Sequence, residues 1–315
     1  MTQPAPSART ASEHAVPTMA VVGYGFIGRR IARTAADRGW DVRVLRRSDA
    51  AGSDPRHELR LGDASNPEVM ADLLRGVDHV VFAAGTVKPA ESDDEPVAEV
   101  VANLGPLLAT LEAVAAHQVG SMTLLSSGGT VYGPEAPVPT REDAELWPIS
   151  SYGVLKVAAE RYVHHYARRY EFAADILRCS NVYGPGEPTT GSQGLIGITR
   201  AQLAEGRPVV VYGDGAARRD FIHVDDLASA VEQLAHRPEG VRVLNAGSGR
   251  SESVAEVIDA VAHSLDVVPV FHRRPARHTD VPVVQLDISR IREVIDFEPR
   301  DVRTALVADR AAGLA

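Results

Sequence analysis

The sequence has very little cysteine and almost no lysine. Cys179 is the single cysteine among 315 residues, so no disulfide can form within the chain and a cysteine-based zinc site is excluded. This usage is typical of a reducing compartment, and we expect a cytoplasmic protein. Lys88 and Lys156 are the only lysines, so arginine carries nearly all the positive charge.

The chain also lacks an excess of positive charge and a long apolar segment. The formal net charge is -9 and the pI is near 5.7. Nucleic-acid binding needs a basic face, so nucleic acid is not an expected partner, although a local basic pocket for a small phosphate ligand is compatible with this charge. No run approaches the length of a membrane span, so no membrane is expected as a partner. Residues 1–18 lack the apolar core of a signal peptide and are predicted to be a disordered tail.

From residue 19 the chain alternates short apolar runs with segments of helical periodicity. This alternation predicts βαβ units and an α/β fold, in which helices cover both faces of a doubly wound parallel sheet of the Rossmann type. We expect residues 19–180 to form a dinucleotide-binding domain and residues 181–315 a smaller substrate lobe interwoven with it. Residues 181–194 are expected to be a loop. The first expected strands are 19–22, 41–45, 57–61, 79–83 and 122–125.

A glycine cluster follows the first expected strand and opens a helix. Glycines at such a turn let the backbone approach a pyrophosphate, and the helix N-terminus offers free N–H groups to it. A dinucleotide cofactor is therefore expected here. The cluster reads Gly23-Tyr-Gly25-Phe26-Ile27-Gly28.

Two arginines stand at the end of the second expected strand, where an NAD site usually carries Asp or Glu. Arg46 and Arg47 could pair with a 2′-phosphate, so we expect NADP(H) to be preferred over NAD(H). Alternatively, both arginines point into solvent. Asp63 follows the third strand, where it could accept a hydrogen bond from the adenine amino group or serve as an ordinary turn residue. Arg29 and Arg30 are interpreted as an exposed helix face.

Tyr152 and Lys156 stand four residues apart near the start of a predicted helix, and therefore share one face of it. An ammonium beside a phenol favours the phenolate, so such a tyrosine can take or give a proton near neutral pH. Carbonyl reduction and alcohol oxidation both require this step. Lysine is so scarce in the chain that its retention at position 156 is itself an argument for a function.

These motifs resemble those of the extended short-chain dehydrogenase/reductases, in particular the NAD(P)-dependent sugar-nucleotide epimerase/dehydratase group that includes UDP-glucose 4-epimerase. The resemblance runs from about residue 19 to 299. Besides the glycine cluster and Tyr152-Gly-x-x-Lys156, it rests on Gly62-Asp63, Phe82-Ala83-Ala84-Gly85, Asn103-Leu-Gly105, Ser126-Ser127-Gly-Gly-Thr130-Val-Tyr-Gly133, Leu177-Arg178-x-x-Asn181-Val-Tyr-Gly-Pro-Gly186, Gly213-Asp-Gly-x-x-x-Arg219-Asp220-Phe-Ile-His-Val-Asp-Asp226 and Asn245-Ala-Gly-Ser-Gly249.

The resemblance implies roles for particular residues. Tyr152 would be the catalytic acid/base, and Lys156 would also bond the nicotinamide ribose. It implies a nucleoside-diphosphate sugar as substrate and a homodimer formed through helices near 95–117 and 152–170. The remaining implied contacts are Ala83, Ala84 and Gly85 with the cofactor, and Asn181, Arg219 and one of Arg273 or Arg274 with the substrate diphosphate and nucleotide.

One departure from the family pattern affects the predicted chemistry. The family usually has a catalytic Ser or Thr three residues before Val-Tyr-Gly, where this chain has Gly128. We therefore expect Thr130, or alternatively Ser127, to donate the second hydrogen bond to the sugar oxygen. No metal is expected, because Asp225 and Asp226 are better explained as helix-starting carboxylates.

Three functions remain open at this point. A 4-epimerase of a nucleotide-linked hexose is favoured, because the Ser-Ser-Gly-Gly-Thr-Val-Tyr-Gly motif covers more positions than the arginine pair. The alternative is an NADPH-dependent 4-ketoreductase, which Arg46 and Arg47 favour. A non-catalytic nucleotide-sensing regulator has the glycine at 128 as its only support. A dehydratase is disfavoured, because the Asp-Glu pair that those enzymes carry is replaced by Gly129 and Thr130.

Overall fold

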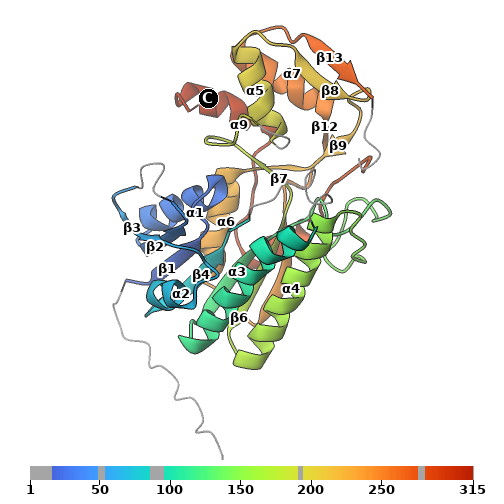
Figure 1. Ribbon diagram of the computed structural model, residues 1–315. Helices are drawn as coiled ribbons and strands as arrows, with labels where there is room; N and C mark the ends of the chain where they lie inside the picture. Colours follow the sequence, from blue (N-terminus) through green and yellow to red (C-terminus); the bar gives the residue numbers. More distant parts are fainter. Residues whose placement is uncertain (1–15, 49–53, 86–95, 191–193, 276–280, 315) are drawn as a thin grey trace, which may run out of the picture.

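A parallel sheet of seven strands organises the larger part of the molecule (Figure 1). The computed structural model describes residues 16–48, 54–85, 96–190, 194–275 and 281–314. Every neighbouring pair in the sheet is parallel, which confirms the predicted doubly wound α/β fold. The strand order is β11 (Val241–Ala246), β6 (Ala173–Cys179), β5 (Ser121–Ser127), β4 (His79–Phe82), β1 (Thr18–Val22), β2 (Asp41–Arg46) and β3 (His57–Leu61).

Helices cover both faces of this sheet because its strands are apolar on both sides. Strand β1 shows the alternation: Met19 and Val21 pack into one core cluster, whereas Ala20 and Val22 pack into another. The first cluster lies under α1 (Phe26–Asp37) and α6 (Val224–Ala235). The second lies under α2 (Pro67–Leu74), α3 (Pro96–Ala116) and α4 (Ser151–Tyr170).

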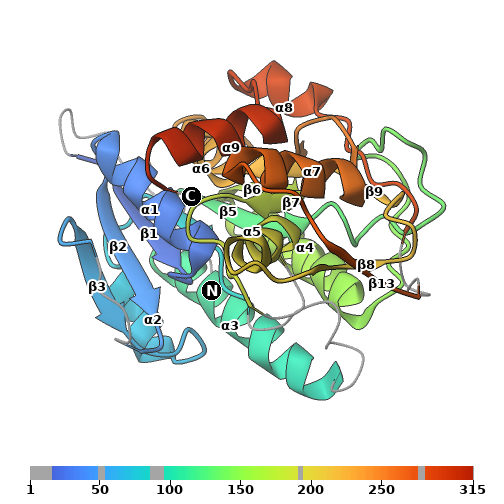
Figure 2. The same ribbon diagram turned by 90° about the horizontal axis from the view of Figure 1, so that it is seen from above.

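A smaller lobe sits over the strand ends and has its own apolar core. Figure 2 looks down on it, with α7 lying beside α5 and α9. Two elements from the second half of the chain, β11 and α6, belong to the larger part of the molecule. Strand β11 pairs with β6 at the edge of the seven-stranded sheet, and α6 packs against α1. The helices of the lobe are α5 (Leu195–Ala204), α7 (Val254–Leu265) and α9 (Val302–Ala311). Its strand pairs are β7 (Asn181–Tyr183) with β10 (Phe221–His223), β8 (Val209–Tyr212) with β13 (Phe271–Arg274), and β9 (Arg218–Arg219) with β12 (Glu252–Ser253). Helix α8 (Ser289–Val294) packs beside β11 of the large sheet.

Two expectations from the sequence need correction. The segment expected as a loop from residue 181 begins with strand β7, because the backbone of Asn181–Tyr183 pairs in parallel with β10. The expectation that no run is long enough to span a membrane was also wrong, since α3 has sufficient length and apolar composition. In this fold α3 lies between α2 and α4 over the sheet, and a third of its apolar window is buried.

Candidate active site

The glycine loop between β1 and α1 is tight enough to require glycine at two positions. Gly23 has φ of +102°, and a Cβ there would lie 2.5 Å from the backbone nitrogen of Ala84. A Cβ on Gly28 would lie 1.9 Å from the carbonyl oxygen of Gly23. The first turn of α1 has no acidic residue and Gly25 provides no side-chain cap, so within the described residues no side chain caps its first N–H groups. This arrangement fits the diphosphate of a dinucleotide.

A cavity of about 350 Å³ opens beside this loop at the carboxyl ends of the strands. Most of the predicted cofactor residues line it. Phe26, Ile27 and Gly28, which serve the turn, and Lys156 on α4 lie outside its lining. The lining includes the predicted Gly23, Gly25, Arg46, Arg47, Asp63, Ala83, Ala84 and Gly85, together with Tyr24, Arg29, Ser48, Asn103 and Pro106. Of these additions, Tyr24 lay within the predicted glycine cluster and Asn103 in another motif noted in the sequence.

Asp63 is held as a turn residue at the edge of this cavity. Its carboxylate accepts hydrogen bonds from the backbone nitrogen and the hydroxyl of Ser65, at 2.8 and 2.6 Å. These bonds, with the charge of Arg47 nearby, keep the pKa of Asp63 below its usual value. The carboxylate therefore stays anionic at the cavity edge, and both of these bonds go to its Oδ1 oxygen.

Lys156 is anchored to the end of strand β5 and lies beside Tyr152. Its ammonium donates a hydrogen bond of 3.0 Å to the carbonyl oxygen of Leu125 and lies 5.5 Å from the centre of the Tyr152 ring. Ser150 begins helix α4 by accepting a hydrogen bond from the backbone nitrogen of Gly153. The predicted one-face arrangement of phenol and ammonium is thus present in the fold.

A buried ion pair fixes α4 one turn beyond Lys156. Glu160 accepts hydrogen bonds from the hydroxyl of Ser126, at 2.5 Å, and from the guanidinium of Arg178, at 2.8 Å. Arg178 also donates to the Tyr132 hydroxyl, which donates in turn to Asn245 on β11. Burial raises the pKa of Tyr132 to about 12, so this phenol remains a neutral donor. The helix that carries Tyr152 is therefore bonded directly to β5 and β6, and through Arg178 and Tyr132 to β11.

The two hydroxyls proposed to replace the family serine have different surroundings. The side-chain oxygen of Thr130 is buried and has no hydrogen-bond partner within the part of the chain that is described. Ser127 is half-buried at the end of β5, and its carbonyl oxygen accepts from the backbone nitrogens of Thr130 and Val131. An unsatisfied buried polar group is destabilising, so the Thr130 hydroxyl lowers the stability of the folded protein.

The predicted substrate residues all lie on strands of the smaller lobe. Asn181 lies on β7 and Arg219 on β9, and their side chains donate to the backbone carbonyls of Asp220 and Val281 respectively. Arg273 and Arg274 lie on β13, a fully exposed strand, and Arg273 donates to the carbonyl oxygen of Asp214. The four residues thus stand on three different strand pairs of the lobe.

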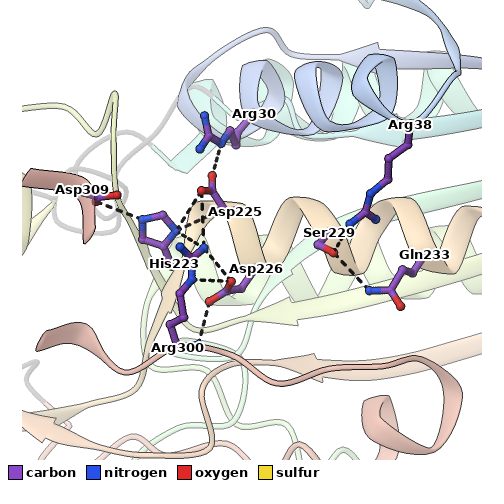
Figure 3. A network of polar contacts seen from close by, with 9 residues as sticks. All are labelled: Arg30, Arg38, His223, Asp225, Asp226, Ser229, Gln233, Arg300 and Asp309. Atoms are coloured by element: carbon purple, nitrogen blue, oxygen red, sulfur yellow. Dashed lines mark hydrogen bonds and ion pairs between the residues drawn. The ribbon is translucent and has the colours of Figure 1, made fainter. Parts of the chain in front are cut away.

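The acidic residues after β10 form ion pairs (Figure 3). Asp225 contacts Arg30 of α1, and Arg300 bonds both Asp226, at 2.8 Å, and His223 Nδ1, at 2.9 Å. The other nitrogen of this buried histidine lies 3.2 Å from a carboxylate oxygen of Asp309. The described residues contain no cluster of three or more His, Cys, Asp or Glu that could hold a metal. This network joins the glycine-loop helix to the second lobe, and Arg30 is therefore not simply exposed.

Comparison with known proteins agrees with this geometry. The profile of the NAD dependent epimerase/dehydratase family matches residues 19–247. A UDP-glucose 4-epimerase of Mycolicibacterium smegmatis is 30% identical over 294 residues, covering 90% of this chain and 93% of the relative. A dTDP-4-dehydro-6-deoxyglucose reductase of Escherichia coli is 29% identical over 287 residues, covering 88% and 90%.

Solved structures are similar over nearly the whole length. The UDP-glucose 4-epimerase of Thermotoga maritima, solved with UDP-glucose, has a TM-score of 0.87 at 27% identity and covers 95% of this chain and 100% of that chain. The UDP-glucose 4-epimerase of Thermus thermophilus, solved with NAD, has a TM-score of 0.83 at 28% identity and covers 94% and 99%.

Proposed function

This chain belongs to the NAD dependent epimerase/dehydratase family and is a nucleotide-sugar enzyme of that family, and we propose that it transfers hydride at C4 of a nucleotide-linked hexose. The observation that carries this proposal is the pairing of Tyr152 with Lys156 at the end of β5. We place 4-epimerisation first. The residues Gly129 and Thr130 supply no carboxylate for water elimination, which argues against a dehydratase.

In this proposal each residue either transfers the proton or holds in position a group that takes part in the reaction. Tyr152 takes the proton of the C4 hydroxyl during oxidation and returns it during reduction. The Lys156 ammonium lies 5.5 Å from the centre of the Tyr152 ring, and its hydrogen bond to the carbonyl oxygen of Leu125 holds it in place. The nicotinamide, when bound, accepts or donates the hydride. Thr130 offers a second hydrogen bond to the C4 oxygen, while the buried pair of Glu160 and Arg178 keeps α4 from shifting.

A 4-ketoreductase is the second candidate, and the cofactor cavity supports it. Arg46 and Arg47 line the cavity at the end of β2. We propose that they favour NADP(H), which a reductase would consume, because guanidinium groups form charge-assisted bonds to a 2′-phosphate. The Thermus thermophilus relative was solved with NAD. NAD(H) is therefore the alternative cofactor, and a binding measurement decides between the two.

We also propose a homodimer through α3 and α4, which lie side by side (Figure 1). Both helices present large apolar side chains to solvent: Val97 is 77% exposed, Val101 68% and Val154 56%. A second copy would cover this face, since exposed apolar patches of this kind mark interaction sites. Light scattering of the wild type and of Val97→Glu/Val101→Glu tests this; the variant should be a monomer.

One assay separates the candidate activities. The purified protein is incubated with UDP-glucose, UDP-galactose or a nucleotide-linked 4-keto hexose, with each cofactor, and products are followed by NMR. Interconversion of the hexoses with no net change of cofactor supports the epimerase. Stoichiometric loss of NADPH with the keto sugar supports the reductase instead. A folded protein that binds cofactor and nucleotide sugar, yet turns over none of them, would support the regulator and overturn both enzyme assignments.

A further inference from the structure

The cofactor cavity has a rigid aromatic floor, which is formed by Tyr24. Tyr24, between the first two glycines of the loop, is 7% exposed, and its hydroxyl lies 2.9 Å from His57 Nδ1. The two rings meet edge to face, with centres 5.8 Å apart. The backbone nitrogen of Asp54 also approaches the hydroxyl, at 3.4 Å. Because both the ring and the hydroxyl are held, the position of Tyr24 does not depend on a ligand.

Cationic side chains approach this floor from two different elements. Arg29, on the second turn of α1, donates from Nε to the carbonyl oxygen of Tyr24 at 3.2 Å, and its guanidinium lies 5.5 Å from the centre of the Tyr24 ring. The guanidinium of Arg46, at the end of β2, lies 6.0 Å from the same centre. Arg47 lines the cavity beside them. The guanidinium groups of Arg29 and Arg46 therefore lie beside the same aromatic ring, and Arg47 belongs to the lining of the same cavity.

The other arginines of α1 are committed to carboxylates, and Arg29 is not. Arg30 pairs with Asp225, and Arg33 lies 3.9 Å from Asp54. Across the described ranges no carboxylate oxygen lies within ion-pair distance of Arg29, which contacts the Tyr24 backbone and ring instead. A guanidinium held this way keeps its remaining N–H donors for a ligand. In a chain with net charge -9, a guanidinium held in this way beside the cavity favours an anionic group of a ligand.

We propose that Arg29 is a specificity-determining residue that binds the 2′-phosphate of NADP(H) together with Arg46 and Arg47. This inference rests on the proposed cofactor use and adds a residue from a different element to it. A 2′-phosphate carries about 1.5 to 2 negative charges at neutral pH and three acceptor oxygens, which several guanidinium groups satisfy better than one. The corresponding ribose of NAD(H) carries only hydroxyl groups, and a third cation would strengthen the binding of these groups very little.

A bracing role for Arg29 makes a different prediction from a phosphate-binding role. If the side chain only supports the glycine loop through Tyr24, its removal weakens NADPH and NADH binding equally. If it binds the 2′-phosphate, the loss falls on NADPH alone. The ratio of the two dissociation constants therefore distinguishes the roles, and needs no sugar substrate.

The experiment titrates the full-length protein with NADPH, NADH, 2′,5′-ADP and 5′-ADP by calorimetry, for the wild type and the variants Arg29→Gln, Arg47→Gln and Arg33→Gln. We expect Arg29→Gln to weaken NADPH and 2′,5′-ADP about tenfold or more, with NADH and 5′-ADP within about twofold of the wild type. Arg33→Gln is the matched control on the same helix and should bind all four ligands like the wild type.

The outcomes separate this inference from the proposed function. Equal loss of NADPH and NADH in Arg29→Gln, or unchanged 2′,5′-ADP binding, overturns the role of Arg29 and leaves the enzyme assignment standing. A wild type that binds NADH more tightly than NADPH overturns the 2′-phosphate site itself. A folded wild type that binds neither dinucleotide overturns the proposed function together with this inference.

Discussion

The side chain of Leu286 closes the space beside Gly128. A Cβ at Gly128 would lie 2.7 Å from Leu286 Cδ1 and 3.0 Å from the carbonyl oxygen of Arg178. Leu286 is 1% exposed, and its backbone nitrogen donates to the buried carboxylate of Asp220 at 3.1 Å. The position where the family usually carries a catalytic hydroxyl is thus filled by a fixed leucine.

Gly128→Ser should therefore destabilise the protein without raising turnover. Forcing extra atoms into a packed core costs about 1–3 kcal/mol. Gly129→Ser is the matched control, because a Cβ at Gly129 meets nothing within 4 Å. Its free energy of unfolding should stay within about 0.5 kcal/mol of the wild type. Chemical denaturation of the three proteins measures this, and equal stabilities would contradict the packing argument.

Tyr152→Phe should lower turnover by about a hundredfold or more, since it removes a group that transfers a proton. Folding and cofactor binding should stay close to the wild type, because Lys156 keeps its bond to Leu125. Steady-state kinetics and cofactor titration measure the two effects. Tyr170→Phe, at the far end of the same helix, is the control and should retain full turnover. Near-normal turnover of Tyr152→Phe would remove the tyrosine from the mechanism.

Thr130→Val should slow turnover while leaving stability unchanged or improved. The Thr130 hydroxyl is buried without a partner among the described residues, so replacing it with a methyl group removes an unsatisfied polar atom. Loss of a second hydrogen-bond donor should cost about tenfold or more in turnover, where tenfold corresponds to about 1.4 kcal/mol. Ser127→Ala is the companion variant. If only Ser127→Ala is slow, Ser127 is the donor; if neither is slow, the second-donor hypothesis is wrong.

Stability should fall as pH rises through the range in which Glu187 ionises. Burial raises the pKa of Glu187 from 4.5 to about 7, and its side-chain oxygen Oε2 has no partner in the described chain. Below pH 4.5 both folded and unfolded states hold the proton. Between about pH 4.5 and 7 the folded state binds more protons, so the free energy of unfolding decreases with pH, by about 3 kcal/mol in all.

The measurement for Glu187 compares thermal unfolding of the wild type and Glu187→Gln from pH 5 to 8. The glutamine has no charge to bury, so the variant should gain stability relative to the wild type as pH rises. A constant difference between the two proteins over this range would show that Glu187 ionises at an ordinary pH.

The sequence was informative where the determining contacts are local. The glycine loop, the strands around it and the spacing of Tyr152 and Lys156 all depend on residues within a few positions of each other. The closed space at Gly128 was not predictable, because Leu286 reaches it from the far end of the chain. The same holds for Arg30, whose partner Asp225 lies on another helix. Arg29 was interpreted as part of an exposed face; it is exposed, but it also lines the cavity.

Strand β11 has a consequence for how the protein is made. Until residue 246 leaves the ribosome, β6 has an unpaired edge, and the core face under α1 lacks its cover from α6. Such an edge can template pairing with another nascent chain. A fragment ending near residue 180 would keep this edge permanently and should aggregate on expression. Stop codons or frameshifts in the second half of the gene would thus yield insoluble products rather than a free cofactor-binding domain.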